Sequence, residues 1–399
     1  MGLDRNIMPK FNHLQFAIDA VKQTRTPFYF YDIDLLHETL ETINRLTANQ
    51  RWKVHYAIKA NGNPRIVKEI ANYGLGADLV SGGEIEAAIK AGFAPENINY
   101  SGVGKTDWEI RSGLEHNIGF FNVESVPELE VINQIAGEMG KSARIAIRVN
   151  PDIDAHTHRY ITTGTADNKF GINLEILDQV INHAIDLPHI LLGGLHFHLG
   201  SQITDMSPYS MLCDTVNRLI DKYEKQDIKF KVINVGGGLG VDYSHPDEHP
   251  LPDLEAYFNT FKQGIRLREY QELHFELGRA IVGNCGTLIS SVVYVKESRN
   301  KRFAILDAGM NDLIRPALYG AHHQVQNITS QEQETEKYEV VGPVCESSDV
   351  FAHDQLMPLT RRGDIIAIRT AGAYGESMAS TYNMRPLLPS VFYSSQQSS

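Results

Sequence analysis

The feature that most constrains the fold of this chain is an alternation of short apolar runs and longer amphipathic stretches between about residues 50 and 276. An apolar or β-branched run of strand length, followed by helical periodicity, predicts parallel strands joined by right-handed helical crossovers. Eight such runs favour a closed (β/α)8 barrel of the TIM type over an open sheet. We predict strands at 54–59, 76–80, 98–100, 119–122, 144–149, 194–198, 232–235 and 272–276. The clearest predicted helices span 64–73, 83–90, 126–138, 208–224 and 254–268.

The pattern changes after residue 276, where strand-like runs follow one another with few helical segments between them. These runs, at 288–295, 302–306, 338–341, 364–369 and 390–393, predict a second, mostly β domain. The run 27–31 is expected to join that domain, because chain termini often meet in space. We therefore expect an α/β protein with a barrel domain at 34–276 and a β-barrel-like or sandwich-like domain formed by 1–33 plus 277–399.

Charge and cysteine usage exclude several classes of protein. The net charge of −12 disfavours nucleic-acid binding, because a phosphate backbone requires a basic surface. The three cysteines, Cys213, Cys285 and Cys345, are far apart and show neither a disulfide framework nor a zinc-ligand spacing. Residues 1–10 contain no apolar leader segment, and no later stretch reaches membrane-spanning length. We therefore expect a protein of the reducing cytoplasm, with neither a membrane nor a nucleic acid as partner.

Lys59 lies at the end of the first predicted strand, in the run Tyr56-Ala-Ile-Lys-Ala-Asn61. The active sites of such barrels lie at the C-terminal ends of the strands. A lysine at an otherwise apolar strand end is costly unless it is used, and burial makes its amine a nucleophile suited to Schiff-base formation. The alternative is a lysine whose stem lies along the barrel rim with its ammonium in water, and the position alone favours that alternative.

Two histidines end the sixth predicted strand, in the run His196-Phe-His198-Leu-Gly-Ser201-Gln. The two-residue period of a strand places both histidines on the inward face. A metal site is one interpretation, with the histidine pairs at 156/158 and 322/323 as further ligands, but no carboxylate falls at a recognisable ligand spacing. We therefore expect no metal, and a structural role in the core is more natural for His196 than for His198.

The last two predicted strands end in Asn234-Val-Gly-Gly-Gly238-Leu-Gly and Glu276-Leu-Gly278-Arg279. A glycine run after a strand lets backbone N–H groups approach a phosphate, although a plain tight turn explains it equally well. Arg279 can bind a phosphate or a carboxylate through its forked guanidinium. Glu276 can pair with the protonated nitrogen of a pyridine ring, and a surface ion pair within one turn is the simpler alternative.

Together these strand ends offer a lysine, a histidine, a glycine loop of phosphate size and a Glu/Arg pair. Each feature is ambiguous alone, but their joint placement at one end of one barrel is much more specific. Pyridoxal phosphate needs such a set: an amine for its aldehyde, a group against its ring, a cradle for its phosphate and a partner for its ring nitrogen. The sequence therefore predicts a pyridoxal-phosphate site.

Nearly the whole chain resembles the fold-type III pyridoxal-phosphate decarboxylases, and among them the diaminopimelate decarboxylases. As a set, the motifs that carry this resemblance are highly specific. They include the strand ends above, His-Thr-His-Arg-Tyr at 156–160 and Asn-Lys-Phe-Gly at 168–171 in a long insert of the fifth crossover (152–170), Asp-Ala-Gly-Met at 307–310, Arg-Pro-Ala-Leu-Tyr at 315–319, Cys-Glu-Ser-Ser-Asp at 345–349, Gly-Ala-Tyr-Gly at 372–375 and Tyr-Asn-Met-Arg-Pro at 382–386.

The resemblance implies a role for individual residues. Lys59 would bind the cofactor as a Schiff base, His198 would stack on its ring, and Glu276 would bind its ring nitrogen. Cys345 would be the catalytic proton donor and, with Glu346, would come from the other subunit of a homodimer. The residues expected around the phosphate are Ser201, Gly238, Gly278 and Arg279; Tyr374 is expected to reach cofactor or substrate, and Arg279, Arg315, Tyr319 and Glu346 to hold the far end of the substrate.

Two positions depart from the family pattern. Leu277 stands where the family commonly has proline, and we expect a change in backbone stiffness without a change in chemistry. Ser348 stands where the family commonly has glycine, and a backbone that required positive φ there would be strained.

The reaction implied is decarboxylation of the amino acid meso-2,6-diaminopimelate to L-lysine and carbon dioxide, the last step of lysine biosynthesis. The far end of that substrate carries a carboxylate and an ammonium, and burying either without a partner is costly. Arg315 and Tyr319 are spaced i, i+4, so one helical turn can present both to the carboxylate. A surface contact near Pro316 is the simpler alternative for this pair.

Three other functions stay open at this point. Arginine decarboxylase is the nearest alternative enzyme, whereas the Cys345 loop disfavours a racemase. A relative that binds partners or handles the cofactor without catalysis would be expected to lack Lys59 or Cys345, and both are present. A metal-dependent barrel hydrolase is the third alternative.

Overall fold

The computed structural model describes residues 12–153 and 169–395. The chain divides into two compact units. The barrel unit comprises Leu40–Gly240 and Pro252–Ile281, and the β unit comprises Met1–Thr39, Val241–Leu251 and Val282–Ser399. The domain boundaries that we predict from the sequence, 34–276 against 1–33 plus 277–399, stay a prediction.

Eight parallel strands of the barrel unit form a closed ring, which confirms the predicted (β/α)8 fold. The ring runs β5-β4-β3-β2-β10-β9-β8-β6 and closes through pairing of β5 with β6, and the short strand β7 (Ile172–Asn173) adds to β6. The strands are β2 (Trp52–Ala57), β3 (Gly76–Leu79), β4 (Ile98–Tyr100), β5 (Phe120–Val123), β6 (Ala143–Asn150), β8 (Ile190–His196), β9 (Val232–Asn234) and β10 (Glu272–Leu277).

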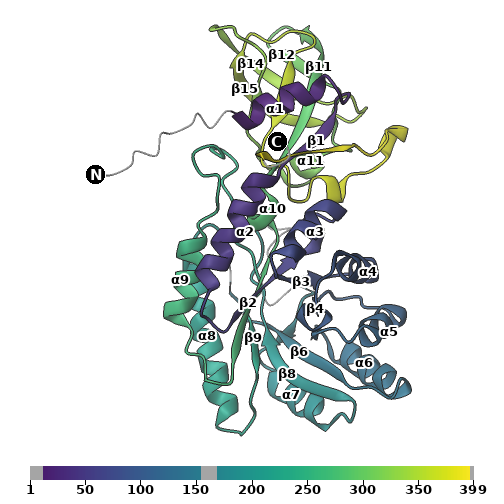
Figure 1. Ribbon diagram of the computed structural model, residues 1–399, viewed down its shortest axis with the longest axis vertical. Coiled ribbons are helices and arrows are strands. Elements are labelled where there is room, and N and C mark those ends of the chain that lie inside the picture. Colours follow the sequence, from purple (N-terminus) through teal and green to yellow (C-terminus); the bar gives the residue numbers. More distant parts are fainter. Residues whose placement is uncertain (1–11, 154–168, 396–399) are drawn as a thin grey trace. The chain divides into compact units, whose positions relative to one another are not determined.

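Helices connect consecutive strands of the ring and cover its outer face (Figure 1). Serine side chains cap two of them: Ser81 accepts from the N–H of Glu84, and Ser125 accepts from that of Glu128. The connecting helices are α3 (Pro64–Asn72), α4 (Gly82–Ala91), α5 (Asp107–Glu115), α6 (Val126–Glu138), α7 (Leu177–Asp186), α8 (Ser207–Glu224) and α9 (Leu254–Gly264), with α2 (Ile33–Thr47) before β2 and α10 (Arg279–Val282) after β10.

The interior of the barrel is unusually polar for this fold, in which branched aliphatic side chains commonly fill the core. His55 of β2 and His274 of β10 are buried and lie 3.1 Å apart between Nε2 and Nδ1. Further buried polar side chains follow along the strands: Asp78, Asn99, Asn122, His196, Asn234 and Glu276. A barrel that places this many hydrogen-bonding groups inside is built around a polar function and not only around packing.

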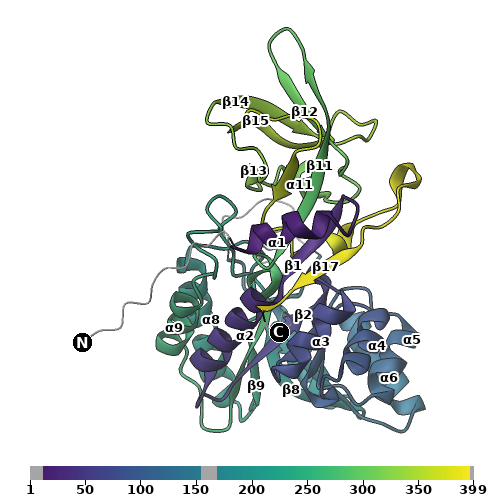
Figure 2. The same ribbon diagram turned by 45° about the horizontal axis from the view of Figure 1, so that its top comes forward.

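The β unit is an eight-stranded sheet, as the second predicted domain requires (Figure 2). Its main path is β13-β16-β11-β12-β14-β15, and β1 (Phe28–Asp32) pairs with β11 and β17. The N-terminal run expected to join this domain therefore does so. The remaining strands are β11 (Gly286–Glu297), β12 (Arg302–Leu306), β13 (Val325–Asn327), β14 (Thr335–Val341), β15 (Val350–Pro358), β16 (Ile365–Ile368) and β17 (Ser390–Tyr393), with helices α1 (Asn12–Val21) and α11 (Arg315–Tyr319).

An apolar core cluster supports this unit where β1, β11 and β16 meet. Phe28 and Phe30 of β1 are buried against Ile289 of β11 and Ala367 of β16, and Ala17 of α1 packs on the same cluster. Burying an aromatic side chain of this size contributes roughly 1.5–3 kcal/mol relative to leaving it exposed. This cluster is what makes the N-terminal segment an integral part of the β unit.

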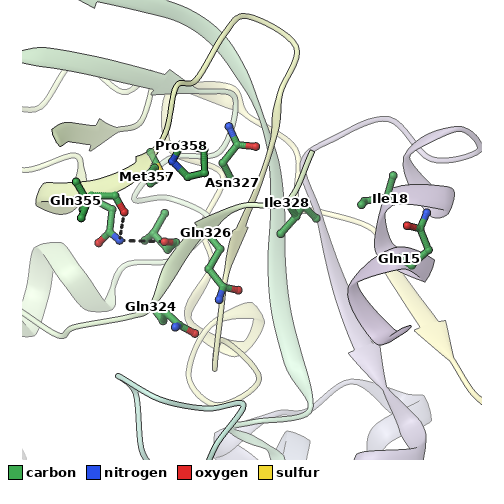
Figure 3. A pocket seen from close by; sticks show the side chains of 11 residues that line it. Gln15, Ile18, Gln324, Gln326, Asn327, Ile328, Gln355, Met357 and Pro358 are labelled. Carbon is green, nitrogen blue, oxygen red and sulfur yellow. Dashed lines mark hydrogen bonds between the residues drawn. The ribbon is translucent and has the colours of Figure 1, made fainter. Parts of the chain in front are cut away.

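A cavity of about 460 Å³ lies between β13 and β15 of the β unit (Figure 3). β13 pairs with β16 and β15 with β14, and Gln355 bridges the two by donating from Nε2 to the carbonyl of Val325 at 3.1 Å. The amide side chains that line the cavity are those of Gln15, Gln324, Gln326, Asn327 and Gln355. No residue predicted to bind cofactor or substrate lines it.

Among the described helices, none combines the length and the apolar character needed to cross a membrane.

Candidate active site

Lys59 lies in a short 3-10 turn, Ile58–Ala60, directly after β2, and not within the strand as predicted. Its Nζ is 3.8 Å from Oδ2 of Asp78, a buried carboxylate at the end of β3, and its side chain is 38% exposed. A Cβ added to Gly278 would lie 3.0 Å from the Cβ of Ala60. Glycine at 278 therefore lets the end of β10 pass close to the turn that carries the amine.

Glu276 is the centre of a buried hydrogen-bonded cluster. Its Oε1 accepts from the side-chain amides of Asn122 at 3.1 Å and Asn234 at 2.6 Å, and its Oε2 lies 2.9 Å from Nε2 of His196. The residue is 5% exposed, so the alternative of a surface ion pair is wrong. Burial alone would raise the pKa of this carboxyl, but the attraction of His196 and of other neighbouring positive groups holds the pKa well below its ordinary value.

His198 lies just beyond the end of β8, beside the glycine loop. The backbone N–H of Gly237 donates to its Nδ1 at 3.3 Å, so the proton of the neutral ring is on Nε2. Desolvation lowers the pKa of His198 well below its ordinary value, and the positive charges of Arg148 and Lys59 lower it further. The side chain therefore presents a neutral aromatic ring.

The loop after β9 needs its glycines. Gly236 and Gly238 have φ values of 70° and 105°, a backbone region that favours glycine. A Cβ added to Gly237 would lie 1.7 Å from the carbonyl oxygen of Glu276, and one added to Gly238 would lie 2.6 Å from that of Gly200. The three glycines 236–238 are closely packed and carry no side chains, so none of them blocks the approach of a phosphate to the backbone.

Arg279 reaches the segment that packs against this loop. Its NH2 group donates to the hydroxyl of Ser201 at 3.0 Å, and the N–H of Ile203 donates to the carbonyl of Gly238 at 2.9 Å. Arg279 is 6% exposed, as expected of a guanidinium held for a ligand. The structure thus brings Arg279 and Ser201 into contact, with Gly238 packed on the segment around Ser201, and Gly278, the fourth residue expected around the phosphate, directly precedes Arg279.

Sequence reasoning missed the residues that connect Lys59 to Glu276. The hydroxyl of Ser101 donates to Oδ1 of Asp78 at 2.7 Å and accepts from Nδ2 of Asn122 at 2.9 Å, and Asn122 bonds Glu276. Burial raises the pKa of Asp78, and the charge of Glu276 raises it further. Their inward positions near the strand ends were the available signal, but Asp, Asn and Ser are equally common there as turn formers.

Residues 35–283 match the family model described as pyridoxal-dependent decarboxylase, pyridoxal binding domain. A diaminopimelate decarboxylase of Bacteroides thetaiotaomicron is 56% identical over 373 residues, which are 93% of this chain and 96% of that protein. One from Aquifex aeolicus is 42% identical over 90% of this chain and 85% of its own length. The crystal structure of the Helicobacter pylori enzyme complexed with L-lysine superposes with a TM-score of 0.90 at 40% identity, covering 95% and 94% of the two chains.

The chain belongs to the pyridoxal-dependent decarboxylase family. The cofactor of this family is pyridoxal phosphate, and the barrel residues fit it chemically. A primary amine, a buried carboxylate that is ionised, a neutral imidazole and a side-chain-free loop beside a guanidinium and a hydroxyl lie at one end of the ring of strands. These are the groups that the aldehyde, ring nitrogen, ring face and phosphate of the cofactor require.

The family motifs of the β unit place Arg315 and Tyr319 at the two ends of α11. Arg315 is 5% exposed, so the alternative of a surface contact is wrong. One of its terminal nitrogens lies 2.9 Å from Nε2 of His323, and its guanidinium carbon lies 4.7 Å from the ring centre of Tyr243. Gly320 ends the helix in a left-handed conformation, with φ of 60°.

Cys345 and Glu346 lie on an exposed loop of the β unit. Asp349 organises this loop from beneath, because its carboxylate accepts from the N–H groups of Met310 and Val344, both at 2.7 Å. Glu346 accepts a hydrogen bond of 2.6 Å from the hydroxyl of Tyr382. Cys345, the residue expected to donate the proton, therefore lies on a loop that is held by hydrogen bonds to Asp349 and exposed to solvent.

Tyr374 occupies the left-handed region, with φ of 58°, in a turn packed against the start of β11. The N–H of Ala371 donates to the carbonyl of Gly286 at 2.8 Å, and a Cβ added to Gly372 would lie 1.9 Å from the carbonyl of Val282. A non-glycine residue at positive φ is strained, and such strain is characteristic of functional positions. Tyr374 is therefore held in a backbone conformation that packing imposes.

The two departures from the family pattern are accommodated. Leu277 is fully buried as the last residue of β10. Ser348 is not among the described residues with positive φ, so the strain that a lost glycine would have caused there does not arise. The histidine motif of the insert, at 156–160, lies outside the described residues, as does Asn168 of the Asn-Lys-Phe-Gly motif, whereas Lys169, Phe170 and Gly171 of that motif are described.

Proposed function

We propose that this chain decarboxylates meso-2,6-diaminopimelate to L-lysine and carbon dioxide, the last step of lysine biosynthesis. The proposal is supported by the pyridoxal-type site within the barrel unit and, within the β unit, by a buried cation, Arg315. A decarboxylase for ornithine or lysine, which lack a distal carboxylate, would gain nothing from such a cation. The relatives named above support the same reaction, since they are diaminopimelate decarboxylases.

When bound, pyridoxal phosphate supplies an aldehyde that condenses with amines and a ring that takes up the electron pair left by carbon dioxide. Lys59 would provide the amine that holds the cofactor aldehyde. Glu276 would keep the ring nitrogen protonated, because its lowered pKa leaves it a carboxylate at neutral pH. His198 would offer its neutral imidazole to the ring. The residues proposed to bind the phosphate are Ser201, Gly238, Gly278 and Arg279, with Tyr374 at cofactor or substrate.

The substrate is selected by the charges at its far end. Arg315 and Tyr319 hold the distal carboxylate, with Arg279, and Glu346 holds the distal ammonium. The bond to the other carboxylate, at the reacting α-carbon, breaks and carbon dioxide leaves. Cys345 or Lys59 then gives a proton to the α-carbon, which completes lysine.

We further propose a homodimer in which Cys345 and Glu346 serve the partner's active site. The exposure of their loop, held in shape by Asp349, supports this assignment. Symmetric homodimers are also the commonest soluble assembly. The cytoplasm is the compartment proposed, because a reactive thiol such as Cys345 needs a reducing environment.

The test is carbon dioxide release by the purified protein with added pyridoxal phosphate. Meso-diaminopimelate, arginine, ornithine and lysine are supplied in parallel, and Lys59→Ala is compared with Lys53→Ala, a lysine of β2 that pairs with Glu272. We expect release from diaminopimelate alone, lost by about a thousandfold in Lys59→Ala and unchanged in Lys53→Ala. Release from arginine, ornithine or lysine instead would overturn the assignment of Arg315 and keep the barrel chemistry. No release from any of the four would contradict the proposed function.

A further inference from the structure

Arg315 is held by side chains that have no assigned role. The imidazole of His323 lies 2.9 Å from one terminal nitrogen of Arg315, and the ring of Tyr243 faces the guanidinium at 4.7 Å. His323 itself is completely buried. The rings of His323 and Tyr243 pack edge to face, with centres 5.0 Å apart and planes at 81°. The guanidinium therefore lies against two rings that also fix each other.

The contacts of His323 determine where its proton is. Its Nδ1 lies 2.9 Å from the backbone carbonyl of Arg369, and a carbonyl oxygen only accepts, so Nδ1 carries the proton. Its Nε2 faces a guanidinium nitrogen, which only donates, so Nε2 must offer a lone pair. The two contacts together require one neutral tautomer. His323 holds Arg315 by accepting a hydrogen bond and adds no charge of its own.

Further hydrogen bonds connect the residues around Arg315 to the sheet of the β unit. Arg369 continues from β16, and its guanidinium donates to Asp247 at 2.9 and 3.3 Å. The N–H of Gln324, next to His323, donates to the carbonyl of Tyr243 at 3.1 Å. Asp247 and Tyr243 belong to one segment of the β unit, Val241–Leu251. This segment, the start of β13 and the end of β16 therefore meet around Arg315.

We propose that His323 is a positioning residue that fixes the fork of Arg315 for the distal carboxylate of the substrate. This inference rests on the proposed function, which makes Arg315 the carboxylate partner. A free arginine loses rotamer freedom when it binds, and a group ordered in advance avoids that loss. A carboxylate in the place of His323 would order the fork but would compete with the substrate for its charge. A neutral imidazole orders it and leaves the positive charge for the ligand.

The product offers a readout that is separate from turnover. Loss of one carboxylate from diaminopimelate leaves lysine, whose remaining carboxylate is the distal one. Cadaverine is lysine without that carboxylate. The difference between the affinities of the holoenzyme for L-lysine and for cadaverine therefore reports the Arg315 contact, with the cofactor and its amine chemistry in common.

The experiment compares holoenzyme with wild-type sequence, His323→Phe, His323→Gln and the exposed neighbour variant His322→Phe. Phenylalanine keeps the ring and removes both hydrogen bonds, whereas glutamine can accept from Arg315 and donate to the carbonyl of residue 369. In His323→Phe we expect lysine affinity to fall by about tenfold and KM for diaminopimelate to rise equally, with kcat changed by less than about threefold and cadaverine affinity unchanged. His323→Gln should recover most of the loss, and His322→Phe should match wild type.

Two results would overturn the proposal: equal weakening of lysine and cadaverine, or His323→Gln as weak as His323→Phe. Should His323→Phe fail to fold, Tyr243→Leu replaces it, because leucine removes the ring face and keeps the imidazole of His323. Tyr243→Leu must then weaken the binding of lysine more than that of cadaverine, or the proposal is wrong. The two hypotheses fail differently. Wild-type protein that binds lysine but releases no carbon dioxide from diaminopimelate would contradict the proposed function, whereas the variants alone decide the role of His323.

Discussion

The two units of the molecule each bury one important charge, and they do so in opposite ways. Glu276 in the barrel unit and Arg315 in the β unit are both 5% exposed. Glu276 is surrounded by groups that respond to its charge: two amides and an imidazole donate to it or pair with it. Arg315 is held by an imidazole lone pair and an aromatic ring. The environment of Glu276 keeps its carboxyl ionised, and the environment of Arg315 fixes the orientation of its guanidinium.

This difference matches what each charge is proposed to do. A carboxylate that must keep a ring nitrogen protonated needs to stay ionised, and the lowered pKa of Glu276 provides that. A guanidinium that must bind a carboxylate is always charged, so the protein has only its geometry to control. Glu276 can be changed in charge while its shape is kept, and Arg315 can be changed in shape while its charge is kept.

The largest effect is expected from Glu276→Gln, which keeps the shape of the side chain and removes its charge. We expect kcat/KM for diaminopimelate to fall by about 10² to 10³, because an amide cannot hold the ring nitrogen in its protonated form. Glu272→Gln, four residues earlier on β10 and paired with Lys53 and His274, is the matched control and should stay near wild type. Steady-state kinetics measures both. A Glu276→Gln enzyme with normal kcat would show that ionisation at this position is unimportant.

A smaller effect is expected from Arg315→Lys, which keeps the charge and removes the planar fork. Lysine cannot donate two parallel hydrogen bonds to one carboxylate or stack on Tyr243 in the same way. We expect KM for diaminopimelate to rise by about tenfold while kcat changes little. Arg362→Lys is a fitting control, since Arg362 also faces an aromatic ring, that of the exposed Tyr294, at 5.0 Å. Equal KM values for wild type and Arg315→Lys would mean that charge alone suffices in the β unit.

The two units also differ in how much of each could be predicted from the sequence. The barrel could be predicted, and so could the placement of Lys59, His198 and Glu276 at one end of it, because a repeated strand–helix period puts the strand ends together. The roles of these residues stay a prediction. The environment of Arg315 could not be predicted, because Tyr243 and His323 come from separate segments whose approach depends on packing of the β unit. His322 and His323 offered only a metal as an interpretation, and among described residues no cluster of three His, Cys, Asp or Glu side chains suits a metal.

Two strands of the β unit were also beyond prediction. β13, Val325–Asn327, has three residues like β4, but only one of them is apolar and it lies outside the repeated strand–helix alternation that revealed β4. β15, Val350–Pro358, contains the polar run His353-Asp354-Gln355, which reads as a turn, and Asp354 indeed has φ of 48°. In both cases pairing with a neighbouring strand, and not local propensity, makes the segment a strand.

The smallest effect concerns a second buried acid of the barrel, Asp78, whose pKa moves opposite to that of Glu276. Burial raises the pKa of Asp78 to about 8, and repulsion by Glu276 adds to it while Lys59 lowers it. In the unfolded chain the same carboxyl loses its proton near pH 4. Between about pH 4 and pH 8 the native state therefore binds the extra proton, and stability must fall as pH rises through that window.

Asp78→Asn removes this titration and keeps the shape of the side chain. Relative to wild type, its melting temperature without cofactor should rise by a few degrees between pH 5 and pH 8, as followed by differential scanning calorimetry. Asp214→Asn, at an exposed position of α8, should show no such pH-dependent gain. Parallel melting curves for Asp78→Asn and wild type across this range would show that Asp78 is ionised in the native barrel. Asp78 and Glu276 would then both be ionised in the native state, and neighbouring positive charges would have to stabilise both carboxylates.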